Sequence, residues 1–156
     1  MSDSLLLDTY VFLWWIRGDR ISIKTETGQE INEIIEDEAN LVYISTITAW
    51  EIAMLKIISQ NKRDRGEFLD ELIFPDDLDG VVQYFGFQWL APEWRHALHL
   101  PNIIPPRGVK NANNDPADHW LVAQALGDNL TFVTADGKII RDFSQTFPIL
   151  KAKKTG

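Results

Sequence analysis

The sequence predicts an α/β protein in which a central, mainly parallel β-sheet is covered by helices on both faces. Short apolar segments typical of buried strands alternate with longer segments whose apolar residues recur at helical spacing. This alternation is typical of parallel sheets, because parallel neighbours need a crossover connection and a helix usually supplies it. The chain has 156 residues, the length of one ordinary domain, so we expect a single layered core.

Strand-like and helix-like segments follow one another along the whole chain. The predicted strands are 5–8, 41–45, 130–134 and 147–150, with a weaker candidate at 87–90. The predicted helices are 9–16, 28–38, a helix from Thr46 or Thr48 to about 58, 76–86, 92–100 and 117–126. Residues 101–114 have the proline- and asparagine-rich composition of a loop. We therefore expect residues 1–150 to form the domain and 151–156 to be a basic tail.

The composition restricts the chemistry that is available to the chain. It contains no cysteine, so thiolate zinc sites, disulfide scaffolds and cysteine nucleophiles are excluded. Any metal must then be held by carboxylate, carbonyl or imidazole groups, and oxygen ligands favour Mg²⁺ or Mn²⁺. The apolar segment 5–16 is interrupted by Asp8 and is shorter than the roughly 18 apolar residues that a membrane span needs. We expect a cytoplasmic protein with no membrane partner.

The formal net charge of −8 is unusual for a protein that binds nucleic acid. Phosphate contacts generally rely on a basic surface. The basic residues here are clustered, in segments 56–65, 107–110 and 151–154, and a bound divalent ion reverses the sign of an acidic pocket. The overall charge therefore does not exclude a nucleic-acid substrate.

Acidic residues follow the predicted strands at the positions where those strands end. Asp8 and Asp136 come directly after or close behind apolar strands, and Glu51 lies in the helix that follows a third strand. Asp115 and Asp118 stand three residues apart around a helix start, so both can face one side of that helix. Because ligands of open α/β sheets bind outside the carboxyl ends of the strands, we expect these acids to converge there.

Taken singly, each acid has an ordinary alternative explanation. Asp8 and Asp115 are suitable helix caps, and the ordinary interpretation of Glu51 is a surface glutamate. Taken together, clustered carboxylates repel one another unless cations are present, which favours a divalent-metal site. Oxygen-bound Mg²⁺ or Mn²⁺ is suited to activating water and to stabilising a phosphoryl group, so phosphodiester hydrolysis is the leading hypothesis.

These motifs together resemble the PIN domains of VapC-type toxins. The residues that carry the resemblance are Leu-Leu-Leu-Asp-Thr at 5–9, Ile-Ser at 44–45 with Trp-Glu-Ile-Ala at 50–53, Asp-Pro-Ala-Asp at 115–118, and Leu-Thr-Phe-Val-Thr-Ala-Asp at 130–136. The order of these pieces covers most of the chain. The resemblance implies a three-layer α/β/α Rossmann-like fold and a Mg²⁺- or Mn²⁺-dependent endoribonuclease, the toxin of a type II toxin–antitoxin pair.

The resemblance also assigns roles to residues and implies partners. The implied catalytic and metal-binding acids are Asp8, Glu51, Asp118 and Asp136, with Asp115 as an accessory metal ligand and with Thr9, Ser45 and Thr134 as supporting residues. The implied partners are the RNA substrate, a cognate antitoxin protein and a second copy of the chain. Lys56, Arg63 and Arg107 are candidate phosphate contacts. The residue after Asp118 is His119, where many relatives carry arginine, so the contact of that arginine is not assigned here.

Two other functions remain open from the sequence. One is a catalytically silent PIN-like module that only binds RNA or protein. Such a module is expected to have lost one or more of the four acids, and all four are present here. The other is a haloacid-dehalogenase-like phosphatase, which also places an aspartate after its first strand. That family needs a second aspartate two residues later, and Tyr10 occupies the position.

Overall fold

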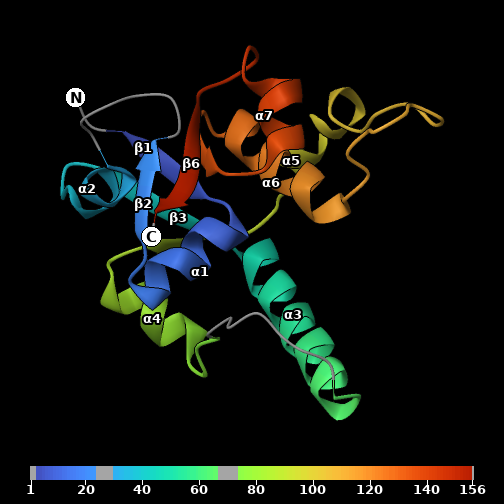
Figure 1. Ribbon diagram of the computed structural model, residues 1–156. Helices are drawn as coiled ribbons and strands as arrows, with labels where there is room; N and C mark the ends of the chain where they lie inside the picture. Colours follow the sequence, from blue (N-terminus) through green and yellow to red (C-terminus); the bar gives the residue numbers. More distant parts are fainter. Residues whose placement is uncertain (1–2, 24–29, 67–73, 156) are drawn as a thin grey trace.

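The structure is a computed structural model that describes residues 3–23, 30–66 and 74–155. In these residues six strands form one sheet with the strand order β2-β6-β5-β1-β3-β4 (Figure 1). The strands are β1 (Ser4–Leu7), β2 (Arg20–Ile23), β3 (Leu41–Ser45), β4 (Gln88–Leu90), β5 (Thr131–Thr134) and β6 (Ile149–Thr155). All neighbouring pairs are parallel except β2 with β6. The predicted α/β/α fold with a mainly parallel sheet is therefore confirmed.

Helices connect the parallel strands and cover the two faces of the sheet. The helices are α1 (Thr9–Arg17), α2 (Ile31–Glu36), α3 (Thr46–Asp64), α4 (Leu78–Tyr84), α5 (Trp94–Ala97), the 3₁₀-helix η1 (Leu100–Asn102), α6 (Pro116–Gly127) and α7 (Gly137–Phe143). The apolar residues of α1, α2 and α4 pack on one face, and those of α6 and α7 pack on the other. Helices thus form the outer layers on both sides of the sheet.

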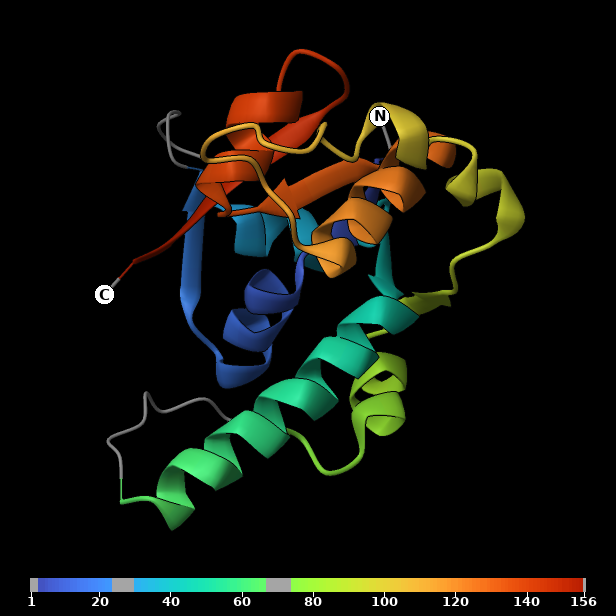
Figure 2. The same cartoon turned by 90° about the vertical axis from the view of Figure 1, so that its right-hand side faces the viewer.

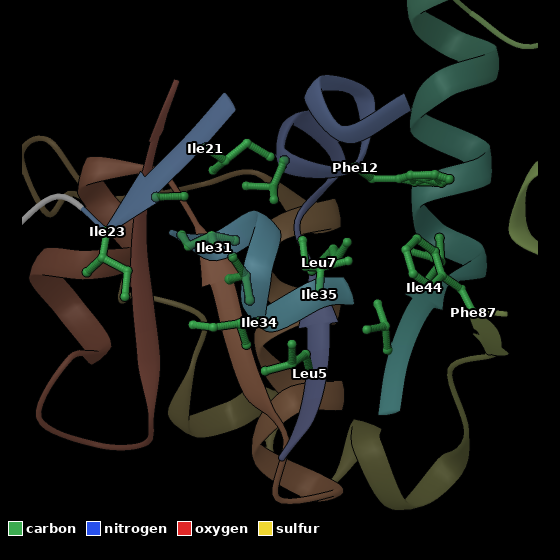
Figure 3. Packing of buried hydrophobic residues seen from close by; sticks show 14 of the residues in the cluster. Leu5, Leu7, Phe12, Ile21, Ile23, Ile31, Ile34, Ile35, Ile44 and Phe87 are labelled. Atoms are coloured by element: carbon green, nitrogen blue, oxygen red, sulfur yellow. The ribbon is translucent and has the colours of Figure 1, made fainter. Parts of the chain in front are cut away.

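The central strand β1 shows how the sequence divides its side chains between the two layers. Leu5 and Leu7 belong to the core beneath α1 and α2 (Figure 3). Leu6 belongs to the core beneath α6. All three are fully buried, as expected for the middle strand of a sheet covered on both sides. Burying this many apolar side chains is the main contribution that holds β1, and hence the residue that follows it, in a fixed place.

Helix α3 is the longest helix described, and it extends away from the sheet in both views of the molecule (Figure 2). The sequence predicts an end near residue 58, but the helix continues to Asp64. Its cap is also different from the predicted Thr46 or Thr48. Ser45 is the N-cap, because its side-chain oxygen accepts a hydrogen bond from the backbone N–H of Ile47 at 3.0 Å.

Other predicted elements differ from the structure at their boundaries. The predicted helix 28–38 is found as α2, and its residues 28–29 lie outside the described part of the chain. The predicted helix 92–100 consists of the short helix α5 followed by η1. The weak candidate strand at 87–90 is present as β4, and α7 is a helix that the sequence analysis did not assign.

The C-terminal residues belong to the sheet. Residues 151–155, which the sequence sets apart as a basic tail, continue β6, and residue 156 lies outside the described part. Beyond its parallel pairing with β5, this strand pairs antiparallel with β2, which the sequence analysis missed. Ala152 is buried between its lysine neighbours and pairs with Ile23, so backbone pairing and one small apolar side chain outweigh the unfavourable composition.

In the described residues, no helix is both long enough and apolar enough to cross a membrane.

Candidate metal centre

A pocket of about 300 Å³ lies where β1 and β5 end and where α1, α6 and α7 begin, beside the second turn of α3. Its acidic lining residues are Asp8, Glu51, Asp115, Asp118 and Asp136. These are the acids that the sequence places at strand ends and helix starts. The structure therefore brings all five predicted acids to one cavity, from segments that are far apart along the chain.

Three of these acids both cap a helix and line the pocket. Asp8, Asp115 and Asp136 are the N-caps of α1, α6 and α7, and each accepts a hydrogen bond from a backbone N–H at the start of its helix. Asp118 lies in the first turn of α6. A helix N-terminus carries partial positive charge, which favours a nearby carboxylate. Several helix starts face one pocket, so their caps are gathered around it.

Asp8 is held by hydrogen bonds on both of its carboxylate oxygens. The Thr9 backbone N–H donates to Oδ1 at 2.8 Å, and the Thr134 hydroxyl donates to Oδ2 at 2.6 Å. The same hydroxyl oxygen accepts the backbone N–H of Asp136 at 3.0 Å. Thr134 is fully buried, and it therefore fixes the positions of the Asp8 side chain and of Asp136 relative to each other.

Glu51 is oriented by two threonines. The Thr9 hydroxyl lies 2.6 Å from Oε1 of Glu51 and donates to it, and the Thr48 hydroxyl lies 3.1 Å from that of Thr9. Thr48 is fully buried and stands three residues before Glu51 in α3. The sequence analysis proposed Thr48 only as a helix cap. Its position one helical turn before Glu51 is the pattern that connects it to the site.

Three of the acids are poorly suited to carrying charge on their own. Burial raises the pKa of Asp8 to about 6, against the lowering effect of its hydrogen bonds with Thr134 and Thr9. Burial also raises the pKa of Glu51 to about 7 and that of Asp118 to about 7, and in each case neighbouring acids of the pocket add to the rise. A cation in the pocket would oppose both causes, because it favours the charged forms.

The donor set of the pocket fits a hard divalent cation. The described residues that line it are acids, threonine, alanine and two aromatic residues, Tyr10 and Trp14, with no lysine, arginine or histidine among them. Carboxylate oxygens are the ligands that Mg²⁺ and Mn²⁺ prefer. We did not assign Tyr10 or Trp14 to the site from sequence.

The acids are not arranged as a preformed metal cage. In the part of the chain that the structure describes, no three histidine or acidic side chains are grouped closely enough to hold an ion as they stand. Oxygens of Asp8, Glu51 and Asp136 accept hydrogen bonds from protein donors. Each carboxylate oxygen has two lone pairs, so one hydrogen bond leaves it able to bind an ion, and ion binding requires the acids to move closer together.

The comparison with protein families decides the assignment of the fold. The family model of the PIN domain matches residues 5–144. The chain belongs to the PIN domain family. No curated protein sequence matches the chain significantly. Membership in this family removes the basis for the haloacid-dehalogenase-like alternative.

Solved structures similar to this PIN domain match it over nearly its whole length. VapBC2 from Rickettsia felis, bound to a DNA fragment from its promoter, is 15% identical with a TM-score of 0.61, over 96% of this chain and 99% of that one. DNA-bound VapBC from Salmonella typhimurium is 20% identical, with a TM-score of 0.56 over 94% and 96%. FitAcB from Neisseria gonorrhoeae is 19% identical, with a TM-score of 0.55 over 94% and 96%. At these identities the similarity establishes the fold.

The predicted phosphate contacts of this PIN domain lie outside the pocket lining. The Lys56 ammonium donates to the backbone carbonyl of Pro75 at 3.0 Å and so links α3 to the segment before α4. Arg63 is exposed near the far end of α3, about 18 Å along the helix axis from Glu51 at 1.5 Å per residue. Arg107 is exposed in the loop before α6. Their role in substrate binding stays a prediction.

Ser45, predicted as a supporting residue, has contacts on the side of α6 rather than in the pocket. Besides capping α3, its hydroxyl donates to Oε1 of Gln124 at 2.6 Å, and Gln124 in turn donates to the carbonyl of Leu90 at 3.0 Å. Ser45 and Gln124 are both fully buried. This chain of hydrogen bonds joins β3, α6 and β4, so it fixes the start of the helix that carries Glu51.

Proposed function

We propose that this PIN domain is a metal-dependent endoribonuclease that hydrolyses RNA phosphodiester bonds, and that it is the toxin of a type II toxin–antitoxin pair. The observation that carries the proposal is the pocket lined by five acids, in which the pKa values of Asp8, Glu51 and Asp118 are raised. A group of neighbouring acids in which Asp8 is buried and Glu51 and Asp118 are partly buried is costly in a purely structural role, and a divalent cation would compensate this cost.

The acids have distinct roles in the proposed site. Asp8, Glu51 and Asp118 hold the principal ion, and Asp136 completes the site or helps to hold a second ion, with Asp115 as an accessory ligand. Bound Mg²⁺ or Mn²⁺ supplies water activation and charge neutralisation at the scissile phosphate. The chain's own contribution is to aim the carboxylates, through Thr9 at Glu51 and through Thr134 at Asp8.

The toxin assignment is supported by the solved structures of the same fold. VapBC2, VapBC and FitAcB each match at least 94% of this chain, so the similarity includes the strand ends and helix starts that form the pocket. The sequence motifs at 5–9, 50–53, 115–118 and 130–136 resemble those of VapC-type toxins in the same order. Together, the fold and the motifs favour a nuclease over a module that only binds RNA.

A protein partner is part of the proposal. Trp50, Met54, Ile57 and Ile58 are 57%, 38%, 54% and 45% exposed on α3, the helix that extends from the body. Exposed apolar side chains that gather on one element often mark an interaction surface. This surface supports the expected cognate antitoxin and homodimer, both of which bury apolar area in complexes of this kind.

Removal of the divalent ion is the experiment that tests the proposed activity. Purified protein incubated with total RNA is expected to cleave it when Mg²⁺ or Mn²⁺ is present and to lose the activity when a chelator is added. Activity should return when the metal is added in excess of the chelator. Product fragments are measured on denaturing gels, with single-stranded DNA of matched sequence as a second substrate.

Three results of this experiment would contradict the proposal. Equal cleavage with and without the chelator would show that the pocket does not act through a cation. Cleavage of DNA in preference to RNA would overturn the assignment of the substrate. Binding of RNA without cleavage under any metal condition would favour the silent binding module.

A further inference from the structure

Asn113, two positions before Asp115, is closely connected to the pocket. It is only 8% exposed, although it lies in the loop between η1 and α6. Its side-chain amide donates to Oδ2 of Asp118 at 2.9 Å, and its amide oxygen accepts the backbone N–H of Asp115 at 2.9 Å. A buried amide with both ends bonded has a fixed orientation.

The chemistry of its partners determines which end of the amide faces Asp118. A backbone N–H can only donate, so the oxygen of the Asn113 amide must face Asp115. The NH₂ group then faces the carboxylate of Asp118, where it donates. Asn113 is therefore a fixed donor aimed at an acid whose pKa is otherwise raised by burial, and this hydrogen bond lowers it.

His119 holds the backbone of Asn113 from the other side. Nε2 of His119 lies 2.8 Å from the Asn113 carbonyl oxygen, and His119 is 8% exposed. A carbonyl oxygen can only accept, so Nε2 carries the hydrogen and donates it. The histidine that follows Asp118 in the sequence thus bonds to the loop, and its ring is turned away from solvent.

We infer that Asn113 is a positioning residue for the metal centre, aiming the Asp118 carboxylate through its amide while His119 fixes its backbone. The inference rests on the metal-dependent nuclease proposed above. The loop that contains Asn113 is thereby connected to the pocket through the hydrogen bonds of this residue to Asp118 and Asp115, while His119 holds its backbone carbonyl. Partners of this kind, which orient a metal ligand, typically change metal affinity or activity 10- to 100-fold when they are removed.

The test is a titration with Mn²⁺, read by the loss of the free-ion signal in electron paramagnetic resonance, with no substrate present. Asn113→Ala is expected to bind Mn²⁺ roughly 10 to 100 times more weakly than the unmodified chain. Asn114→Ala is the matched control, because Asn114 is the exposed neighbour whose amide faces only the carbonyl of Ala112, at 3.5 Å. Its affinity should equal that of the unmodified chain.

A second pair of variants tests the role of His119 and does not disturb the amide of Asn113. His119→Gln retains an N–H donor that can reach the same backbone carbonyl, so this variant should keep most of the Mn²⁺ affinity. His119→Leu fills similar space without a donor and should weaken binding in the same direction as Asn113→Ala. This pair decides the question if Asn113→Ala does not fold, as judged by its thermal midpoint without metal.

The outcomes separate the inference from the proposed function. If the unmodified chain binds Mn²⁺ and Asn113→Ala binds it within twofold, the positioning role is overturned and the nuclease proposal stands. Equal affinities of His119→Leu and His119→Gln would have the same meaning. If the unmodified chain binds no Mn²⁺, the proposed function fails, and the inference fails with it.

Discussion

Replacing Asp8 by asparagine is expected to reduce RNA cleavage at least about a hundredfold while the protein remains folded. Removal of a group that merely orients a metal ligand already costs 10- to 100-fold, and Asp8 is proposed to be a ligand itself. Asparagine keeps the size of the side chain and removes its charge. Initial cleavage rates of a defined RNA at saturating Mn²⁺ measure the effect.

The same substitution should change the stability of the metal-free chain at pH 8 only slightly, because two effects oppose each other. Asp8 is 8% exposed, and burial raises its pKa to about 6, so its charged form is disfavoured in the folded state at that pH, and a neutral side chain relieves this cost. The asparagine NH₂ group, however, cannot accept the hydroxyl hydrogen of Thr134. Asp64→Asn, which removes an exposed acid at the far end of α3, is the matched control and should leave cleavage unchanged. Activity of Asp8→Asn within threefold of the unmodified chain would contradict the role of Asp8.

The metal-free protein is expected to lose thermal stability as the pH rises from 5 to 8. Folding raises the pKa of Asp8, Glu51 and Asp118 to about 6, 7 and 7, from ordinary values near 4. The folded state then binds more protons than the unfolded state between these values, so the free energy of unfolding decreases with pH from about 4 to about 7 and is level above that range. Between pH 5 and pH 8, deprotonation of Asp8 alone lowers the free energy of unfolding by roughly 1.4 kcal/mol.

Calorimetry with a chelator present measures this dependence. At roughly 2–4 °C per kcal/mol for a domain of this size, we expect the unfolding midpoint to fall by at least about 5 °C when the other two acids are included. Saturating Mn²⁺ should reduce the fall, because the ion favours the charged forms and stabilises the folded state that binds it. Asp8→Asn should show a smaller fall than the unmodified chain. A midpoint that rises between pH 5 and 8 in the metal-free chain would refute the explanation.

The positions of the acids could be predicted because they depend on the most regular part of the fold. An apolar run such as 5–7 is recognisable as a buried strand, and the residue after it must lie at the strand's carboxyl end. Asp8 and Asp136 follow from this rule, and Asp118 follows from the helix start at Pro116. The ligand roles of these acids are still predictions.

The groups that orient the acids could be predicted only in part. The family resemblance implies Thr9 and Thr134 as supporting residues, but the sequence does not give the bond of Thr134 to Asp8 across 126 positions. Asn113 was not predicted, because it lies in a loop whose path no periodicity describes. Asn113 was visible only as one of several asparagines before α6. Strand β2 was missed for the same reason. Its four residues have no strong sequence pattern of their own, and the strand is defined by its pairing with β6.

The central claim is that these separated carboxylates share a divalent cation, and a direct Mn²⁺ titration tests it without reference to any substrate. We predict saturable binding by the unmodified chain, competed by excess Mg²⁺, and its loss in a double variant with Asp8→Asn and Asp118→Asn. Equal binding by the double variant, or no saturable binding by the folded unmodified chain, would contradict the claim.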